Sequence, residues 1–417
     1  MPSDPSLRIA DMTRRRVLQT LATWAATAGA GAGAHGSEVD ADADKIAKLG
    51  LDSLARLSLA SLRQRDYDAR FQLVASTDDG VIASYRSDGL RVYARLIVPP
   101  PALARPPAGW PVIIHTHGWV GEQGAPGYRF GQGSTDSVAS LLAGFAQAGY
   151  LVVIPGLRGH GRFNDVPAAG LEWLKAYDNG SYLTPIFYAV DVLHALQALA
   201  TLDDARPGLK IDSRRLYLTG HSQGGDAALT ALAVSSSPRL PLKFAAASIW
   251  AGCFEGRIEQ GQYYGAMEAS AAALGDPRFL QVMPHWWKPA MYTGTIQQGQ
   301  QRRQQQMYDT VRRQVSDQAE ADPLRHPVDK AMAAIDAIKH PQLIGVPLQL
   351  HYSDMDHYSP PAWNERLANG VNTAGGSAEL WRYAGNTHGF QVAPGWSPPG
   401  SVAGLELLGQ RTLALFC

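Results

Sequence analysis

One serine flanked by glycines constrains the fold of this chain more than any other feature. Residues 220–225 read Gly-His-Ser-Gln-Gly-Gly, directly after the apolar run 216–218 and before the helical run 226–234. Glycine is needed on both sides of the serine because a Cβ there would collide with the neighbouring strand or helix. The pattern predicts a sharp turn that exposes the hydroxyl of Ser222, with a helix N-terminus beneath it that favours negative charge.

Short apolar runs alternate with helical segments on both sides of this turn. Strands are predicted at 112–114, 151–154, 216–218, 245–250, 346–350 and 380–383, after a β-hairpin that turns at residues 87–89. Helices are predicted at 137–148, at 185–200 with Thr184 as N-cap and Pro185 at the first helical position, after Ser222, and at 361–368. This alternation predicts an α/β protein with a mainly parallel sheet and helices on both faces.

The alternation breaks once, between residues 253 and 343. This segment contains Ala-, Gln- and Arg-rich helical stretches and no convincing strand, and residues 296–306 are almost wholly polar. A second, independent helical domain would give the same pattern. Because the segment enters and leaves between adjacent strands, we predict instead an inserted helical cap over the carboxyl edge of the sheet.

The serine needs a histidine base, and the base needs a carboxylate that holds its tautomer. With a serine turn of this kind the order along the chain is Ser, acid, His. The acid should end a late strand, where Asp354 and Asp356 are both candidates, and the base should follow the last strand, where His388 is the clear choice.

Two N–H groups are needed to stabilise the oxyanion of a tetrahedral intermediate. One should be the backbone N–H of Gln223, directly after the serine. The other should come from the loop after an early strand, where residues 115–119 read His-Thr-His-Gly-Trp. Gly118 would let this loop approach the serine, and the backbone N–H of Trp119 would be the second donor; His117 is expected to shape the loop by bonding to backbone.

Several further segments accompany these residues. They are 87–90, 117–118, 149–153 and 158–161, beside 220–225 and 388–390. On these segments the chain, from about residue 84 to residue 390 and outside the insertion, resembles the catalytic domain of the prolyl oligopeptidase and dienelactone hydrolase branch of the α/β-hydrolases. The resemblance implies the α/β-hydrolase fold and a Ser-His-Asp serine hydrolase.

The resemblance also bears on the acid and on the substrate. The acid of this family usually stands four residues before a proline that begins the next helix, as Asp356 does before Pro360 and Asp354 does not. The resemblance therefore favours Asp356. Fewer than ninety residues precede the domain, so the β-propeller of oligopeptidases is not expected, and this argues against oligopeptidase activity.

The leading functional prediction is a carboxylic ester hydrolase that needs no cofactor and no metal, acting on a small-molecule or polymeric ester. A peptidase or amidase with the same triad is the nearest alternative. A metal-dependent hydrolase is another alternative, and it would use the side chains of His115, His117, Asp354, Asp356 and His357. A non-catalytic binding protein on the same scaffold is a further alternative, disfavoured because all three triad residue types occur in order.

The N-terminus predicts export from a bacterial cytoplasm. Residues 13–19 read Thr-Arg-Arg-Arg-Val-Leu-Gln and precede an Ala- and Gly-rich stretch to residue 34, which together resemble a twin-arginine signal peptide. The predicted divisions are a signal peptide at 1–34, a lead-in at 35–80, hydrolase core at 81–252 and 344–417, and the cap at 253–343. We expect a mature periplasmic or secreted protein that is not stably inserted in a membrane.

Charge and cysteine content limit the partners. Lys plus Arg and Asp plus Glu number 37 each, so no net field favours nucleic acid, and no nucleic-acid partner is expected. Only two cysteines occur, Cys253 and Cys417, which argues against a zinc or iron–sulfur site. A disulfide between them stays open at this level.

Overall fold

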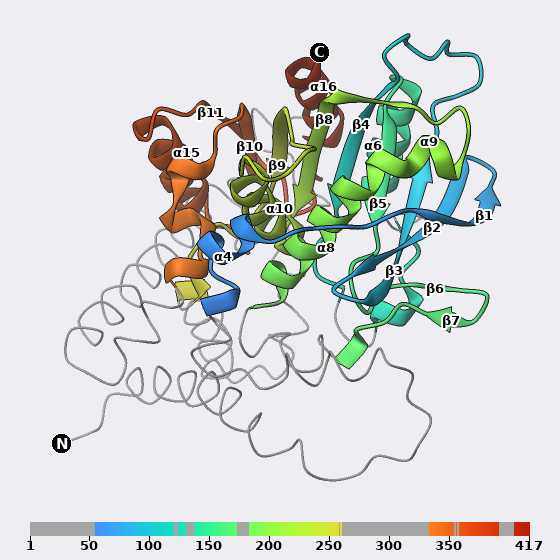
Figure 1. The fold of residues 1–417 in the computed structure, drawn as a ribbon. Helices are drawn as coiled ribbons and strands as arrows, with labels where there is room; N and C mark the ends of the chain where they lie inside the picture. Colours follow the sequence, from blue (N-terminus) through green and yellow to red (C-terminus); the bar gives the residue numbers. More distant parts are fainter. Residues whose placement is uncertain are drawn as a thin grey trace, which may run out of the picture.

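The computed structural model describes residues 55–120, 124–130, 137–172, 183–257, 259–260, 333–353, 356, 358–391 and 404–417. Its main feature is a nine-stranded sheet in the order β1-β2-β3-β5-β4-β8-β9-β10-β11 (Figure 1). The strands are β1 (Gln72–Thr77), β2 (Gly80–Ser87), β3 (Leu90–Ile97), β4 (Trp110–Thr116), β5 (Leu151–Pro155), β8 (Ile211–His221), β9 (Ala246–Trp250), β10 (Leu348–Ser353) and β11 (Ala378–Tyr383). A separate pair is formed by β6 (Arg162–Phe163) and β7 (Val166–Pro167).

The sheet is parallel except at its beginning. Strands β5, β4, β8, β9, β10 and β11 pair in parallel, whereas β1, β2 and β3 pair antiparallel and β3 joins β5 antiparallel. The predicted hairpin is β2 and β3, and its turn residues Asp88 and Gly89 have φ of 52° and 81°, as a tight hairpin turn requires. The predicted α/β class is thus confirmed.

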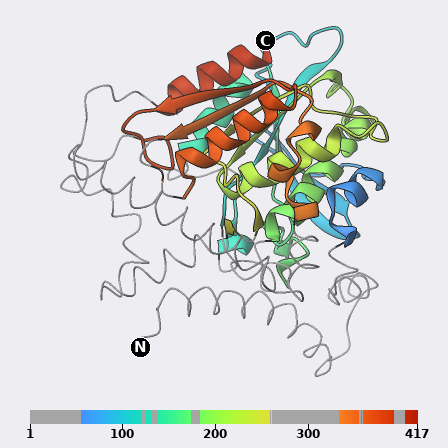
Figure 2. The ribbon, with the colours of Figure 1, turned by 90° about the vertical axis from the view of Figure 1, so that its left-hand side faces the viewer.

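Helices cover both faces of the sheet. They are α4 (Leu59–Gln64), α6 (Ser137–Gln147), α8 (Thr184–Ala198), α9 (Leu202–Ala205), α10 (Gln223–Ser235), α15 (Pro361–Thr373) and α16 (Gly404–Phe416). Side chains from α4, α8, α10 and α15 join one core cluster, and those from α6 and α16 join the clusters on the opposite face. Helices α15 and α16 accordingly lie on opposite sides of β10 and β11 in Figure 2.

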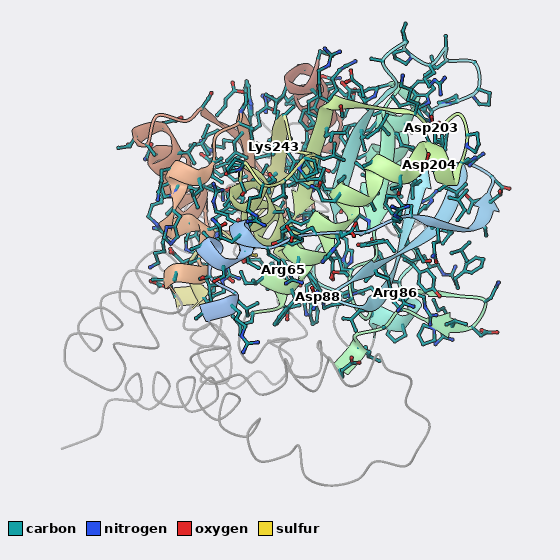
Figure 3. The ribbon with its side chains drawn as sticks, viewed as in Figure 1. Arg65, Arg86, Asp88, Asp203, Asp204 and Lys243 are labelled. Atoms are coloured by element: carbon teal, nitrogen blue, oxygen red, sulfur yellow. The ribbon has the colours of Figure 1, made fainter. Side chains whose placement is uncertain are left out.

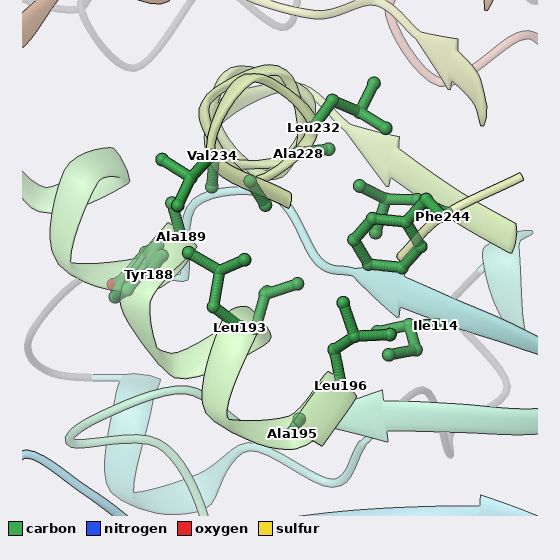
Figure 4. Close-up of a cluster of buried hydrophobic side chains, with 14 of the residues drawn as sticks. Ile114, Tyr188, Ala189, Leu193, Ala195, Leu196, Ala228, Leu232, Val234 and Phe244 are labelled. Carbon is green, nitrogen blue, oxygen red and sulfur yellow. The ribbon is translucent and has the colours of Figure 1, made fainter. Parts of the chain in front are cut away.

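Successive side chains of the central strands point to opposite faces of the sheet and so pack into the two different cores. In β4, Val112 and Ile114 belong to the larger cluster, while Ile113 between them belongs to the other. Part of the larger cluster lies between α8 and α10, where Leu193 of α8 points toward α10 and Leu196 lies beside Ile114 (Figure 4). This core fixes the helix that follows Ser222 against the sheet.

Two predicted element boundaries were wrong. Helix α8 begins at Thr184 itself, and the preceding Leu183 makes no side-chain capping bond. Thr184 and Leu183 are both buried, and among the described residues the hydroxyl of Thr184 has no hydrogen-bond partner, so it does not cap the helix. The sheet also begins earlier than predicted, since β1 is an edge strand with an exposed pattern that lacks hydrophobic alternation.

A buried ion cluster ties the hairpin turn to the core. Arg158, 1% exposed in its side chain, donates to Asp191 of α8 at 2.7 Å and lies 3.3 Å from Asp88 of the turn. Asp88 also pairs with Arg65, just after α4, and Figure 3 shows these two side chains near each other. The described end of the lead-in is therefore held to the core by charge as well as by the buried Leu62 of α4.

Two predicted segments fall largely outside the described residues. These are the signal peptide at 1–34 and most of the predicted cap, residues 261–332. Strands β9 and β10 are parallel neighbours, with Ala247 opposite Leu348, so the segment between them does connect adjacent strands. Among the described residues, one helix, Thr184–Ala205, has the length and apolarity of a membrane span, and 89% of its apolar window is buried within the protein.

Candidate active site

The predicted site residues all follow the carboxyl ends of parallel strands. Ser222 follows β8, the Gly118 loop follows β4, Asp356 follows β10 and His388 follows β11. The register pairs Thr116 with Gly220 and Ser353 with Tyr383. The strands therefore end at one edge of the sheet, which is where ligands bind in open α/β sheets.

Ser222 lies at a sharp turn between β8 and α10. Its φ is 56° and its ψ is −126°, a backbone conformation that non-glycine residues rarely adopt and that persists only where the surroundings enforce it. The N–H of Ser222 donates to the carbonyl of Trp250 at 3.2 Å, and its carbonyl accepts from the N–H of Gly225 at 2.9 Å. The turn is thus held on both sides by backbone bonds.

Glycines let the surrounding backbone close on the serine. A Cβ on Gly220 would lie 2.7 Å from the carbonyl oxygen of Gly224. One on Gly224 would collide with the carbonyl oxygens of Thr116 and His117, and one on Gly225 would lie 2.7 Å from Ile249. These contacts confirm the predicted need for glycine on both sides of the serine.

The loop after β4 reaches the serine turn as predicted. A Cβ on Gly118 would lie 3.2 Å from the Cβ of Ser222. The next residue, Trp119, is 56% exposed. Gln223 is the first residue of α10, so its N–H has no partner within the helix. The predicted pair of oxyanion donors therefore belongs to two segments that meet beside Ser222.

The ring of His117 fixes the backbone of this loop. Its nitrogens lie 2.7 Å from the carbonyl oxygen of Gly118 and 3.1 Å from that of Gly156. Its ring packs on Tyr128 with centroids 4.2 Å apart. His117 thus has the loop-shaping contacts expected from the sequence.

Asp356 and His388 are hydrogen-bonded to each other. The Nδ1 of His388 lies 2.7 Å from one carboxylate oxygen of Asp356, and the other oxygen accepts from the N–H groups of Tyr358 and Ser359 at 2.9 and 3.0 Å. The Asp356 side chain is fully buried, while that of His388 is 18% exposed. A buried carboxylate with this many donors can orient a ring that stays open to the site.

A contact that sequence reasoning missed joins this pair to the serine turn. The Nε2 of His221 lies 3.1 Å from the backbone oxygen of His388, and the two rings lie 4.9 Å apart at their centroids. Because His221 is the residue before Ser222, the loop that carries His388 lies beside the serine turn. No local pattern could have revealed this bond, since its partners are 167 residues apart.

A second missed feature is a buried cluster at the start of α10. The guanidinium of Arg257 lies 2.6 Å from Asp226 in the first turn of α10 and 3.0 Å from Asp336. Burial raises the pKa of both carboxyl groups, and Arg257 opposes that shift. The cluster ties the described ends of the 253–343 insertion to the helix that carries the serine.

The residues of the metal alternative do not form a described cluster. The ring of His115 stacks on Trp250 and bonds to Thr219 at 3.1 Å, and burial lowers its pKa well below the ordinary value. Asp354 and His357 lie outside the described residues. In the described part of the chain no three metal-ligating side chains gather. Cys253 is buried and Cys417 is exposed, and the two do not form a disulfide with each other.

Comparison with known proteins gives structural likenesses only. No family model matches the chain, and no curated protein is detectably similar in sequence. Pyrococcus horikoshii acylaminoacyl peptidase is similar with a TM-score of 0.48 at 15% identity, covering 83% of this chain and 41% of that one. An acetyl xylan esterase from Paenibacillus sp. R4 is similar with a TM-score of 0.44 at 16% identity, covering 82% of this chain and 94% of that one.

A puromycin-hydrolysing peptidase of Mycobacterium tuberculosis has a TM-score of 0.45 at 16% identity, with 84% of this chain and 39% of that chain covered. The chain spans 35% to 41% of the length of the peptidases compared. The fold itself is defined by the strand order, the antiparallel entry and the strand–serine–helix turn. Together these features make it the α/β-hydrolase fold.

Proposed function

We propose that this protein is a serine hydrolase that cleaves carboxylic esters through an acyl-enzyme intermediate. The observation that carries the proposal is the 2.7 Å hydrogen bond between Asp356 and His388. The backbone of His388 also contacts the side chain of His221, the residue before Ser222. Ser222 is the nucleophile, His388 the general base and acid, and Asp356 the carboxylate that holds the base.

The reaction has two halves. The Oγ of Ser222 attacks the ester carbonyl carbon while His388 takes its proton, and the oxyanion is stabilised by the N–H groups of Gln223 and Trp119. Collapse of the intermediate breaks the bond to the alcohol, which leaves with the proton from His388. Water then attacks the acyl-enzyme with His388 again as base, which releases the acid and frees Ser222.

The geometry supports this assignment in two ways. The strained φ of Ser222 projects the residue from the turn, and the N-terminus of α10 starts directly after it, which favours developing negative charge. Asp356 uses one oxygen for His388 and the other for two backbone N–H groups, so its orientation is fixed before substrate binds.

The first experiment replaces the nucleophile. Ser222→Ala is expected to lower kcat on a p-nitrophenyl ester by at least about 10⁴-fold and to abolish labelling by a fluorophosphonate probe. Ser236→Ala, at the C-cap directly after α10, is the matched control and should retain both. Full ester turnover by Ser222→Ala would contradict the proposal.

A second measurement separates esters from amides, because the same triad can cleave either. The purified chain is expected to turn over a p-nitrophenyl ester faster than an aminoacyl p-nitroanilide. Faster cleavage of the anilide would favour a peptidase or amidase.

We further propose that the protein is exported to the periplasm or secreted, since residues 13–34 have the features of a twin-arginine signal peptide. The exported chain should begin near His35, which mass spectrometry of the periplasmic fraction measures. A periplasmic or secreted chain that retains residue 1 would contradict cleavage, and a chain confined to the cytoplasm would contradict export.

A further inference from the structure

His221 is the variable residue of the Gly-x-Ser-x-Gly turn, and its side chain contacts more of the site than its place in the motif suggests. It is the last residue of β8. Its Nε2 lies 3.1 Å from the backbone oxygen of His388, and its ring lies 4.9 Å from the ring of His388. Its Nδ1 faces the oxyanion loop, because a Cβ on Gly118 would lie 3.2 Å from that nitrogen.

We propose that His221 is a positioning residue which, as a neutral imidazole protonated on Nε2, fixes the backbone of His388 relative to Ser222. The inference rests on the proposed function and adds a role to it. A carbonyl oxygen can only accept, so the 3.1 Å contact requires a proton on Nε2 of His221.

The surroundings of His221 favour the neutral ring. Burial and, to a lesser extent, the neighbouring His388 lower the pKa of its ring, while the bond to the His388 carbonyl and the charge of Asp356 raise it; together they bring the pKa to about 3. The ring of Trp250 stacks over it with centroids 6.4 Å apart. With one proton, held on Nε2, the ring presents a lone pair on Nδ1 toward the Gly118 loop.

A second anchor on His388 matters because one bond does not fix the direction of a ring. Asp356 holds Nδ1, and His221 holds the main chain of the same residue. The Nε2 of His388, which has to take the proton of Ser222, is then aimed from two points. A misplacement of about 1 Å at such a site can cost about 10²-fold in rate.

The test uses two substitutions that differ in the donor. His221→Phe keeps an aromatic ring and removes the N–H, whereas His221→Gln keeps an N–H donor at similar reach. We expect His221→Phe to lower kcat on a p-nitrophenyl ester about 10- to 100-fold with KM within about twofold. His221→Gln should recover most of that loss.

The matched control is His351→Gln, because His351 is also a buried histidine of the sheet but bonds to Tyr383 and Ser248 and not to the loop that carries His388. It should leave kcat near the wild-type value. Thermal melting of every variant identifies changes in stability. Wild-type kcat in His221→Phe, or equal losses in the Phe and Gln variants, would overturn the proposal.

The outcome for His221 can be separated from that for the proposed function. If Ser222→Ala abolishes turnover and His221→Phe does not change it, the triad stands and the positioning role fails. If Ser222→Ala keeps full turnover, the proposed function itself fails.

Discussion

Two histidines near the ends of neighbouring strands are held in similar ways but have different surroundings. His388 follows β11, and its Nδ1 bonds to the carboxylate of Asp356 at 2.7 Å. His351 lies in β10, and its Nδ1 bonds to the hydroxyl of Tyr383 at 2.8 Å. Its Nε2 lies 3.0 Å from the hydroxyl of Ser248, and that hydroxyl is hydrogen-bonded to the hydroxyl of Thr412 at 2.7 Å.

The difference teaches what allows a histidine to act as a base. The hydroxyl partners of His351 carry no charge and its side chain is buried; burial and, to a lesser extent, the charge of Arg411 lower its pKa to about 3. It therefore stays neutral and joins β9, β10, β11 and α16. The carboxylate beside His388 can stabilise an imidazolium, and that side chain is 18% exposed. His388 and His351 therefore differ in the charge of the hydrogen-bond partner and in the exposure of the side chain, more than in the hydrogen bond itself.

The largest expected effect comes from removing the charge at the first site. Asp356→Asn should lower kcat about 10³- to 10⁴-fold on a p-nitrophenyl ester, because an amide neither holds the required tautomer nor stabilises the imidazolium. Steady-state kinetics measures the change.

The matched change at the second site is Tyr383→Phe, which removes the hydroxyl partner of His351. It should leave kcat within about threefold and reduce stability by about 1–3 kcal/mol, because a buried ring nitrogen loses its partner. A Tyr383→Phe enzyme as inactive as Asp356→Asn would erase the distinction between the two histidines.

A smaller expected effect, on stability, tests whether the serine turn is held by close backbone packing, unlike the side-chain network of His351. The serine turn depends on the close approach of Gly224 to the carbonyls of Thr116 and His117, whereas the His351 network depends on side chains. Gly224→Ala should lower the free energy of unfolding by about 3 kcal/mol, since neither carbonyl can move aside cheaply. Urea unfolding measures this loss.

The control for this change is Gly144→Ala in α6, where an added Cβ meets no atom within 4 Å. There the substitution should raise stability by up to about 1 kcal/mol through helix propensity. Equal stability of the Gly224→Ala and Gly144→Ala variants would show that the carbonyls of Thr116 and His117 do not restrict the space at Gly224.

The local part of this architecture could be predicted from the sequence. The run 216–234 specifies a strand, a turn and a helix in consecutive residues, and its glycines report a steric need that neighbours in sequence create. The strands at 112–114 and 151–154 could be predicted because they are continuous apolar runs. They are apolar at every position because their successive side chains pack into the two opposite cores.

Two long-range contacts that no motif marks could not be predicted. The bond between His221 and His388 spans 167 positions, and the contact between Arg257 and Asp336 spans 79. Asp354 and Asp356 follow the same strand two residues apart, so strand position alone cannot distinguish them; the family resemblance favoured Asp356, which does lie against His388. Strand β1 was missed because exposed edge residues carry no periodic signal.

The smallest expected effect is the pH dependence that the buried His351 confers on stability. The unfolded chain takes up a proton at this position near its ordinary pKa of about 6.5, whereas the folded protein does so only near pH 3. Between these values the unfolded state binds more protons, so this histidine makes stability fall as the pH falls. His351→Gln should reduce that slope by up to about 1.4 kcal/mol per pH unit, as measured by urea unfolding at pH 6, 5 and 4. Tyr383→Phe keeps the buried His351 ring, so it should keep the wild-type slope although the variant is less stable. If His351→Gln has the same slope as the wild type, protonation of His351 does not contribute to the loss of stability in acid.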